Sequence, residues 1–392
     1  VPIVPRGAGS GLAGAANAVD GCVVLSLERM TDVVEVDAAS RLAVVQPGVT
    51  GDGLRAAVAG DGLWYAPDPA SAAFSTIGGN VATNAGGLCC VKYGVTREAL
   101  LGLEVVLASG EVVRLGGRTR KRSAGYDLMG LLCGSEGTLG VVTEVTARLL
   151  PAPPAGATVA ASFPRLEQAG AAVSAITAAL TPAVLEIMDA ATIAAVEDYR
   201  PMDLDRDAEA MLFARSDAAG AAAPAEAERI AALCEAAGAD LAVVSDDPAE
   251  GRMLMAGRRL AHPALEHRGA TLLDDVCVPL GKIINLLAGI PPIAARHDVT
   301  IATFGHAGDG NMHPTIVYDP HDPDGPTRAR DAFTDLLALV SDLGGTISGE
   351  HGAGILKRAW LPRELGAAAD VQRRIKSALD PHGLLNPGPS LR

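Results

Sequence analysis

Residues 6–14 read RGAGSGLAG, and two further runs share their character: STIGGNVATNAGG at residues 75–87 and GSEGTLGVV at residues 134–142. Glycine lets backbone N–H groups approach an anion closely, and successive N–H groups can form a nest for phosphate. The first run is not the G-x-G-x-x-G fingerprint of a βαβ dinucleotide unit. Three such runs in one region indicate a long, phosphate-bearing ligand that is contacted along its length. Three tight turns of a β-rich domain are the alternative.

Short apolar segments separated by glycine surround these runs and predict a β-rich domain. Strands are expected at residues 23–27, 33–36, 43–45, 104–108, 111–115 and 139–149. Ser109-Gly110 joins the fourth and fifth of these as a hairpin, because Gly suits a tight turn. The last segment alternates apolar and polar residues, which is typical of a half-buried strand.

The sequence changes character at residues 151–156, where PAPPAG has the composition of a linker. Beyond it the chain is Ala-rich, and helices are expected at residues 166–180, 225–237 and 332–343, the last stopped by Gly344-Gly345. Low complexity at residues 218–227 indicates a surface helix or loop, and YDPHDPDGPT at residues 318–327 indicates a loop. We expect two domains and a closing segment, at residues 1–150, 151–360 and 361–392.

Charge and cysteine usage exclude several classes of protein. The net charge of −14 argues against nucleic-acid binding, and the short basic stretch at residues 118–122 is interpreted as a solvated loop. None of the six cysteines forms a C-x-x-C pair, which argues against a zinc finger or an iron–sulfur cluster and favours a reducing, cytoplasmic compartment. No apolar run approaches the ~20 residues that span a bilayer. The chain begins at Val1 inside a strand-like run, so we expect a preceding segment that this sequence lacks.

A second constellation lies in GHAGDGNMHP at residues 305–314 and TISGEHGAG at residues 346–354. His306 and His313 are seven residues apart, but the intervening Gly-Asp-Gly argues against a helix. A tight turn can instead fold both imidazoles toward one point. Two histidines plus Glu350, with an open position, make a known catalytic pattern for zinc or iron, although the spacing fits no local zinc motif. A pair of hydrogen-bonded structural histidines is the alternative, and the remaining histidines are interpreted as structural or surface residues: His262, His267, His297, His321 and His382.

The three glycine-rich runs, with GYDL and CGSEGTLGVVTEV in register, resemble the FAD domain of the vanillyl-alcohol oxidase superfamily, and within it glycolate oxidase catalytic subunits and bacterial D-lactate dehydrogenases. The resemblance covers nearly the whole chain. It implies an α+β fold, with an FAD-binding domain of the vanillyl-alcohol oxidase/p-cresol methylhydroxylase type that lacks its N-terminal part. An α+β substrate or cap domain with an antiparallel sheet would follow it.

The same resemblance implies cofactor contacts along all three runs. They are Arg6, Gly7, Gly9, Ser10, Gly11, Ser75, Thr76, Gly78, Gly79, Asn80, Thr83, Asn84, Gly86, Gly87, Gly137 and Val142. Some members of the superfamily carry a histidine bonded to the flavin where Ser10 stands here, so FAD is expected to bind non-covalently. The missing N-terminal part leaves open whether this chain retains FAD.

The second constellation resembles the paired signature of the 2-hydroxyacid branch of that family. The resemblance assigns His306, His313 and Glu350 to a divalent metal (Zn, Mn or Fe) and His351 to the catalytic base. Arg258, in MAGR at residues 255–258, matches the arginine that binds the substrate carboxylate, although the family's Trp is replaced. Leu273 lies near the position where 2-hydroxyglutarate specialists carry a substrate-binding lysine. Lys357 is expected at the surface.

The implied function is an FAD-dependent dehydrogenase that oxidises a small 2-hydroxy acid, such as glycolate or D-lactate, to the 2-keto acid. His351 would abstract the proton while hydride passes to the flavin. Because the chain has no cysteine cluster for an internal relay, we expect an external electron acceptor such as an iron–sulfur subunit. A homodimer or a hetero-complex is expected, cytoplasmic or at the membrane through a partner. Three alternatives stay open: a flavin-free metallohydrolase, a non-catalytic FAD-fold subunit, and another flavoenzyme such as an ether-lipid synthase.

Overall fold

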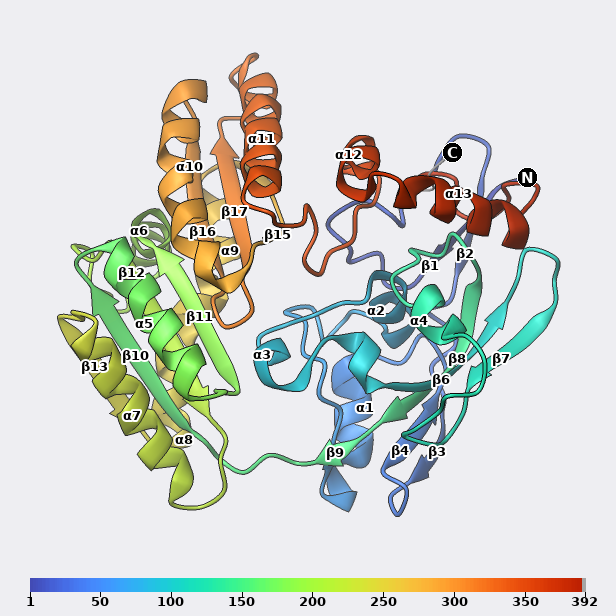
Figure 1. Ribbon diagram of the computed structural model, residues 1–392, viewed down its shortest axis with the longest axis horizontal. Coiled ribbons are helices and arrows are strands. Elements are labelled where there is room, and N and C mark those ends of the chain that lie inside the picture. Colours follow the sequence, from blue (N-terminus) through green and yellow to red (C-terminus); the bar gives the residue numbers. More distant parts are fainter. Residues whose placement is uncertain (390–392) are drawn as a thin grey trace. The chain divides into compact units, whose positions relative to one another are not determined.

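The computed structural model describes residues 1–389, which form two compact units. Unit 1 comprises Val1–Cys89, Tyr93–Ala152 and the described residues from Glu350 onward, and unit 2 comprises Cys90–Lys92 and Pro153–Gly349. The chain therefore enters unit 2 within the PAPPAG segment and leaves it directly before Glu350 (Figure 1).

Unit 1 is built on a five-stranded antiparallel sheet of order β3-β4-β8-β6-β7. Its strands are β3 (Val33–Asp37), β4 (Leu42–Val45), β6 (Leu100–Val106), β7 (Val112–Gly116) and β8 (Val141–Arg148). Two smaller pairs accompany it, parallel β1 (Ile3–Arg6) with β2 (Val23–Ser26) and antiparallel β5 (Leu63–Trp64) with β9 (Leu150–Pro151). The expected strands of this region are confirmed, including the β6–β7 hairpin.

The helices of unit 1 are short except for the last. They are α1 (Gly51–Val58), α2 (Ile77–Thr83), α4 (Leu128–Leu132), α12 (Leu361–Leu365) and α13 (Ala368–Leu379), with 3-10 turns η1 (Ala59–Asp61), η2 (Thr96–Ala99) and η4 (Arg358–Trp360). The single turn α3 (Cys90–Tyr93) places its first three residues with unit 2.

The core of unit 1 lies between the central strands and helices α1 and α2. Val145 and Ala147 of β8 are fully buried, whereas Thr146 between them is partly exposed, as the alternating pattern predicted. Ile77 and Val81, one helical turn apart on α2, pack into the same apolar cluster. This packing fixes α2 against the sheet.

Unit 2 is built on an eight-stranded antiparallel sheet of order β13-β10-β12-β11-β16-β17-β14, with β15 also paired to β17. Its strands are β10 (Ala157–Phe163), β11 (Val184–Asp189), β12 (Ala210–Ser216), β13 (Leu241–Ser245), β14 (Ala270–Leu273), β15 (Val276–Cys277), β16 (Thr300–His306) and β17 (Asn311–Tyr318). The expected antiparallel sheet is therefore present.

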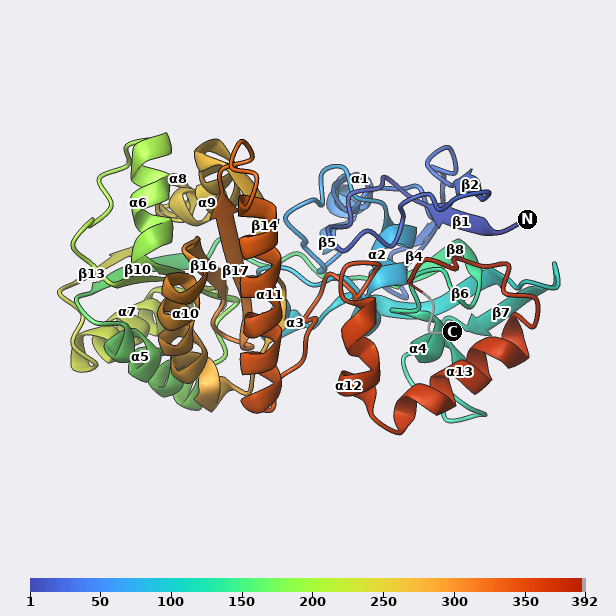
Figure 2. The same ribbon diagram turned by 90° about the horizontal axis from the view of Figure 1, so that it is seen from above.

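Helices cover both faces of this sheet (Figure 2). One face carries α5 (Leu166–Ala179), α7 (Ala222–Ala236) and α10 (Ile283–His297), with α11 (Gly325–Asp342) beside α10 and η3 (Leu280–Lys282) ahead of it. The other face carries α6 (Ala190–Tyr199), α8 (Pro248–Leu254) and α9 (Ala256–Arg268). The expected helices correspond to α5, α7 and α11.

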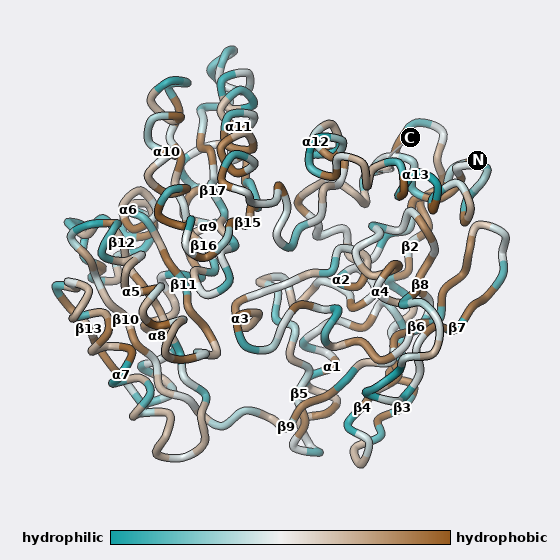
Figure 3. The backbone as a smooth tube through the Cα atoms, in the orientation of Figure 1, coloured by the Kyte–Doolittle hydropathy of each residue, from teal (hydrophilic) through white to brown (hydrophobic). Residues whose placement is uncertain are grey.

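Double coverage explains the sequences of the central strands. Every residue of β10 is buried, and so are nearly all residues of β11, β12, β16 and β17. Such strands read as continuous apolar runs rather than as alternating ones, and Figure 3 shows apolar residues along β10 and β11. A polar or charged side chain on these strands is therefore unusual and needs a partner.

Candidate functional site

The β16–β17 hairpin brings His306 and His313 to one face of the unit 2 sheet. The register pairs His306 with Asn311 and Phe304 with His313, so residues 307–310 form the turn. Opposite residues of antiparallel strands, and alternate residues of one strand, share a face. The two imidazole centroids lie 5.1 Å apart in an edge-to-face arrangement. The predicted tight turn is thus confirmed.

Glycine is required at the turn for two separate reasons. Gly310 has φ +87°, and a Cβ added there would lie 2.2 Å from the carbonyl oxygen of Val278. A Cβ added to Gly308 would lie 2.6 Å from Cγ2 of Val91. The Gly-Asp-Gly sequence therefore permits a turn that larger residues would disrupt.

A buried carboxylate, Glu186 on β11, contacts both His306 and Arg258. The register of β11 with β16 pairs Ile187 with Gly305, and the next step of that antiparallel ladder sets Glu186 opposite His306. Glu186 Oε1 lies 2.6 Å from His306 Nδ1, and Glu186 Oε2 lies 2.8 Å from Arg258 Nε. Glu186 is 0% exposed, and a buried carboxylate of this kind needs such polar and cationic partners.

Arg258 is held in place by a second contact. Its guanidinium carbon lies 4.6 Å from the ring centroid of Phe304, the geometry of a cation–π interaction. Arg258 lies on α9, which packs against β11, β16 and β17. The predicted substrate-binding arginine therefore lies on the same face of the sheet as the two predicted metal-binding histidines.

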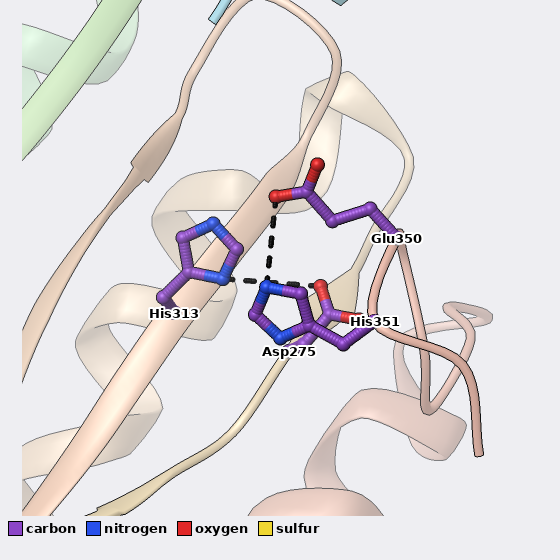
Figure 4. Close-up of side chains that lie close together, drawn as sticks. All are labelled: Asp275, His313, Glu350 and His351. Carbon is purple, nitrogen blue, oxygen red and sulfur yellow. Dashed lines mark ion pairs between the residues drawn. The ribbon is translucent and has the colours of Figure 1, made fainter. Parts of the chain in front are cut away.

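Asp275, between β14 and β15, is a further buried carboxylate in this group. Its Oδ1 accepts a hydrogen bond from Asn311 Nδ2 at 2.7 Å and lies 3.8 Å from His313 Nδ1 (Figure 4). Its Oδ2 accepts a hydrogen bond from Ser348 Oγ at 3.1 Å. Sequence reasoning missed Asp275, although adjacent aspartates at 274 and 275 between apolar strands are a usable signal, because such residues are seldom buried without a partner.

The chain that leaves unit 2 runs beside Asp275. Thr346 forms two backbone hydrogen bonds with Cys277, at 2.8 and 3.1 Å, and Ser348 bonds to Asp275 as described. Glu350 and His351 follow as the first residues of the returning part of unit 1. Within that part Glu350 Oε1 lies 3.8 Å from His351 Nε2, and both side chains are partly buried (Figure 4).

The three glycine-rich runs converge in unit 1. A Cβ on Gly7 of the first run would lie 2.1 Å from Thr76 Oγ1 of the second run. The backbone N–H of Glu136 in the third run donates to the carbonyl of Ala82 at 2.7 Å. These close approaches require small residues, so part of the glycine content serves packing between the runs.

The second run is largely a helix rather than a loop. Its residues form α2, whose N-cap Thr76 accepts a hydrogen bond from the N–H of Gly79 at 3.3 Å. Asn84 ends the helix with φ +54°. Gly78 is small because a Cβ there would lie 2.4 Å from Pro47 Cβ. The other predicted contacts of this run lie within or beside the helix: Ser75, Asn80, Thr83, Gly86 and Gly87.

The first run offers backbone amides for an anion. Arg6 Nε and Nη2 both donate to the carbonyl of Ala16, at 3.0 and 2.7 Å, and so close the run into a loop. Among residues 1–389, the backbone N–H groups of residues 7–11 donate to no backbone carbonyl. This part of the chain includes Gly9, Ser10 and Gly11, and it fits the diphosphate of a dinucleotide cofactor.

The third run meets the closing part of the chain within unit 1. Glu136, at φ +52°, accepts a hydrogen bond from the N–H of Gly354 at 2.9 Å, and burial raises the pKa of its carboxyl to about 7. Asn386 Nδ2 donates to the carbonyl of Glu136 at 2.6 Å. The last residue of this run, Val142, lies on β8 and is part of the apolar core.

Lys357 is not at the surface, contrary to expectation. It is 2% exposed, and its backbone N–H donates to the carbonyl of Ala353 at 2.9 Å. The preceding Ile355 and Leu356 both donate to the carbonyl of Ala13, which folds this segment onto the first glycine-rich run. The expectation failed because the segment's position depends on a contact with residues more than three hundred positions earlier in the chain.

Comparison with known proteins identifies the class to which this fold and these loops belong. Residues 1–116 match an FAD binding domain, and residues 152–389 match the C-terminal domain of FAD linked oxidases. The protein is therefore an FAD-dependent oxidoreductase, and the chain belongs to the FAD-linked oxidase family. The flavin-free hydrolase considered above is set aside by this membership.

Relatives cover the full chain. It is 42% identical over 391 residues to glycolate oxidase subunit GlcD of Bacillus subtilis, with 99% of this chain and 83% of that protein aligned. It is 40% identical over 397 residues to the protein of that name in Escherichia coli K12, with 100% and 79% aligned. It is 37% identical over 399 residues to the D-lactate dehydrogenase of Archaeoglobus fulgidus, with 100% and 86% aligned.

Solved structures confirm the fold class. p-Cresol methylhydroxylase matches with a TM-score of 0.82 at 18% identity, over 99% of this chain and 84% of that one. An alkyldihydroxyacetonephosphate synthase matches with a TM-score of 0.73 at 19% identity, over 98% and 71%. Within the described part of the chain, no helix combines the length and the apolar character needed to cross a membrane.

Proposed function

We propose that this flavoenzyme oxidises a small 2-hydroxy acid, glycolate or D-lactate in particular, to the corresponding 2-keto acid. The observation that carries the proposal is the buried face of unit 2 on which Arg258, His306 and His313 lie together. An arginine and two imidazoles suit a small substrate that has a carboxylate and an adjacent hydroxyl. The names of the relatives, a glycolate oxidase subunit and a D-lactate dehydrogenase, support the same substrate class.

FAD would be held non-covalently by the three glycine-rich runs of unit 1, with the amides of residues 7–11 toward its diphosphate. Ser10 offers no ring nitrogen for a covalent flavin link. When bound, FAD accepts the hydride that leaves C2 of the substrate. Arg258 would bind the carboxylate through its terminal nitrogens, since its Nε is paired with Glu186.

A divalent metal, Zn, Mn or Fe, would be held by His306, His313 and Glu350, with Asp275 as a fourth candidate ligand. Imidazole and carboxylate donors suit these ions, and the set Asp275, His313, Glu350 and His351 could hold one. Ser348 is bonded to Asp275, and two residues span at most about 7 Å, so the chain cannot carry Glu350 far from that carboxylate. When bound, such a metal lowers the pKa of a coordinated hydroxyl.

His351 would be the base that accepts the proton of the substrate hydroxyl. Imidazole is the most frequent general base in enzymes, and His351 adjoins the proposed metal ligand Glu350. The substrate thereby loses the hydroxyl proton to His351 and the C2 hydride to the flavin, and a C=O bond forms. A partner would then reoxidise the flavin. The proposed acceptor is an iron–sulfur subunit, a quinone-linked chain or a cytochrome, because the chain has no C-x-x-C pair for a cluster of its own.

Anaerobic flavin reduction tests this function directly. FAD-loaded protein is mixed with glycolate, D-lactate, L-lactate or D-2-hydroxyglutarate, and the flavin absorbance is followed with and without a chelator. We expect glycolate or D-lactate to bleach the flavin and the chelator to slow bleaching. If none of the four acids bleaches the flavin, the proposed function is contradicted.

A separate variant tests the proposal that His351 is the base. His351→Ala should slow flavin reduction roughly 10²- to 10⁴-fold, the usual contribution of a general base. The matched control is His382→Ala, because His382 is exposed. Near-normal reduction by His351→Ala would show that another group takes the proton.

A further inference from the structure

We propose that Glu186 is a positioning residue that orients His306 and Arg258 at the same time. The inference rests on the proposed function, in which His306 binds the metal and Arg258 binds the substrate carboxylate. Glu186 would touch neither metal nor substrate. One buried carboxylate would instead connect the metal site to the carboxylate site and hold both at a fixed separation.

The contact with His306 selects one form of the imidazole. Glu186 Oε1 lies 2.6 Å from His306 Nδ1, and a carboxylate oxygen at this position favours the imidazole tautomer that carries its proton on Nδ1. Nε2 then keeps its lone pair, which is the form that binds a metal. A carboxylate behind a metal-binding histidine also fixes the plane of the ring and raises its basicity.

The contact with Arg258 selects one orientation of the guanidinium. Glu186 Oε2 lies 2.8 Å from Arg258 Nε, and Phe304 covers one face of the group. The ion pair at Nε and the ring on one face together restrict rotation of the guanidinium and leave its two terminal nitrogens as a fork. A fork binds a carboxylate in two places only if its plane is held.

A plain structural ion pair is the competing explanation, and the same strand offers a comparison. Asp189, three residues after Glu186 on β11, is partly buried. It accepts hydrogen bonds from the backbone N–H groups of Thr192 and Thr303, at 2.8 and 2.7 Å, and thereby caps α6. Asp189 thus binds backbone, whereas Glu186 binds two side chains with proposed roles at the site. Loss of either carboxylate should cost stability, but only Glu186 should matter for the metal and the substrate.

Glu186→Gln in the full-length, FAD-loaded protein tests the inference. The variant keeps the volume and removes the charge. After chelator treatment, Mn²⁺ and Zn²⁺ are titrated by calorimetry, and we expect the metal Kd to rise roughly 10- to 100-fold. The KM for the better of glycolate and D-lactate should rise about tenfold or more, because the carboxylate anchor loses its orientation.

Asp189→Asn is the matched control. It should lower Tm through the weakened cap of α6 and leave the metal Kd and the KM within about twofold of wild type. Equal metal Kd and KM in wild type and Glu186→Gln would overturn the positioning role, as would an equal rise of both in Asp189→Asn. If the Gln variant does not fold, the same quantities are measured on Glu186→Asp, which keeps the charge but is one methylene shorter. We expect an intermediate loss for it, and wild-type values would overturn the role.

The two proposals fail differently. Wild-type protein that binds neither ion and is reduced by no hydroxy acid would overturn the proposed function and this inference with it. Wild-type protein that binds metal and reacts, alongside a Glu186→Gln variant of equal Kd and KM, would overturn this inference alone.

Discussion

Carboxylates that are partly or fully buried in this protein differ in pKa according to the groups that surround them. Burial raises the pKa of Asp189 to about 6, although the N–H groups of Thr192 and Thr303 oppose that shift. Burial likewise raises the pKa of Glu136 to about 7, with the N–H of Gly354 as its opposing partner. Asp380 is also buried, but Lys376 and two backbone N–H groups outweigh that burial and hold its pKa below the usual range. Local donors therefore decide which of these groups stay ionised near neutral pH.

The raised pKa of Glu136 predicts how stability depends on pH. The folded-state pKa of about 7 exceeds the ordinary value of 4.5, so the folded protein binds this proton more tightly than the unfolded chain. The associated stability is fully present below pH 4.5 and is lost as pH rises through about 7. The free energy of unfolding of wild type should therefore fall by up to about 3 kcal/mol more than that of Glu136→Gln over this interval.

Urea titrations at pH 5 and pH 8 measure this difference. Glu111→Gln is the control, because Glu111 is an exposed carboxylate of the same unit. It should follow the wild-type pH dependence. A Glu136→Gln variant that follows it equally would show that Glu136 is already ionised at pH 5.

At the scale of elements, the β16–β17 hairpin depends on its glycines. Gly310→Ala should destabilise the hairpin by about 2 kcal/mol or more, since it combines a left-handed φ of +87° with a Cβ 2.2 Å from a carbonyl oxygen. Because His306 and His313 flank this turn, the metal Kd should rise as well. Gly281→Ala is the control, as an added Cβ there meets nothing within 4 Å. Equal Tm and metal affinity in both variants would show that the turn tolerates a side chain.

The elements that could be predicted are those with a local pattern. Alternation at residues 139–149 predicted β8, and helical spacing followed by Gly344-Gly345 predicted α11. The strands β10 and β11 have no alternation because helices bury both of their faces, and so they were not predicted. The prolines Pro291 and Pro292 would have argued against α10, yet that helix continues through both.

The residues of the candidate site also divide into those that a local sequence pattern predicts and those that depend on distant contacts. His306 and His313 could be brought together from sequence because they are only seven positions apart and the Gly-Asp-Gly between them predicts the turn. Glu186 could not, since its contact with His306 joins residues 120 positions apart through the register of β11 and β16. Strand register over such a distance is set by packing of the whole sheet. Arg258 was predicted only through the resemblance to the family, and its partner Glu186 was identified only in the structure.

At the scale of the whole molecule, the two ends of unit 1 are joined. The N–H of Ile3 donates to the carbonyl of Leu384 at 2.7 Å, and the N–H of Asn386 donates to the carbonyl of Ile3 at 2.8 Å. Lys376 Nζ donates to Asp380 at 2.5 Å and to the carbonyl of Thr138 in the third glycine-rich run at 2.6 Å. The end of the chain thus secures both the first strand and a proposed flavin-binding loop.

Lys376→Met should therefore weaken both the fold of unit 1 and its hold on FAD. It leaves Asp380, which is 2% exposed, without its cation, a change that typically costs about 3–5 kcal/mol. Arg373→Met is the control on the same helix, because its pair with Asp370 is exposed and worth at most about 1 kcal/mol. We expect Lys376→Met to lower Tm and the ratio of flavin to protein absorbance, whereas Arg373→Met should change neither.

Adding Asp380→Asn to Lys376→Met separates charge from packing. If the unpaired carboxylate causes the loss, the double variant should recover part of the Tm, because the amide keeps acceptor capacity for the N–H groups of Leu384 and Leu385. The sign of the Asp380 shift adds a pH criterion. A lowered folded-state pKa means stability that is present above the ordinary pKa of 3.8 and lost as pH falls further, so the single-variant defect should shrink in acid. A defect that persists unchanged at low pH would assign the role of Lys376 to its bonds with Thr138 and Leu385 instead.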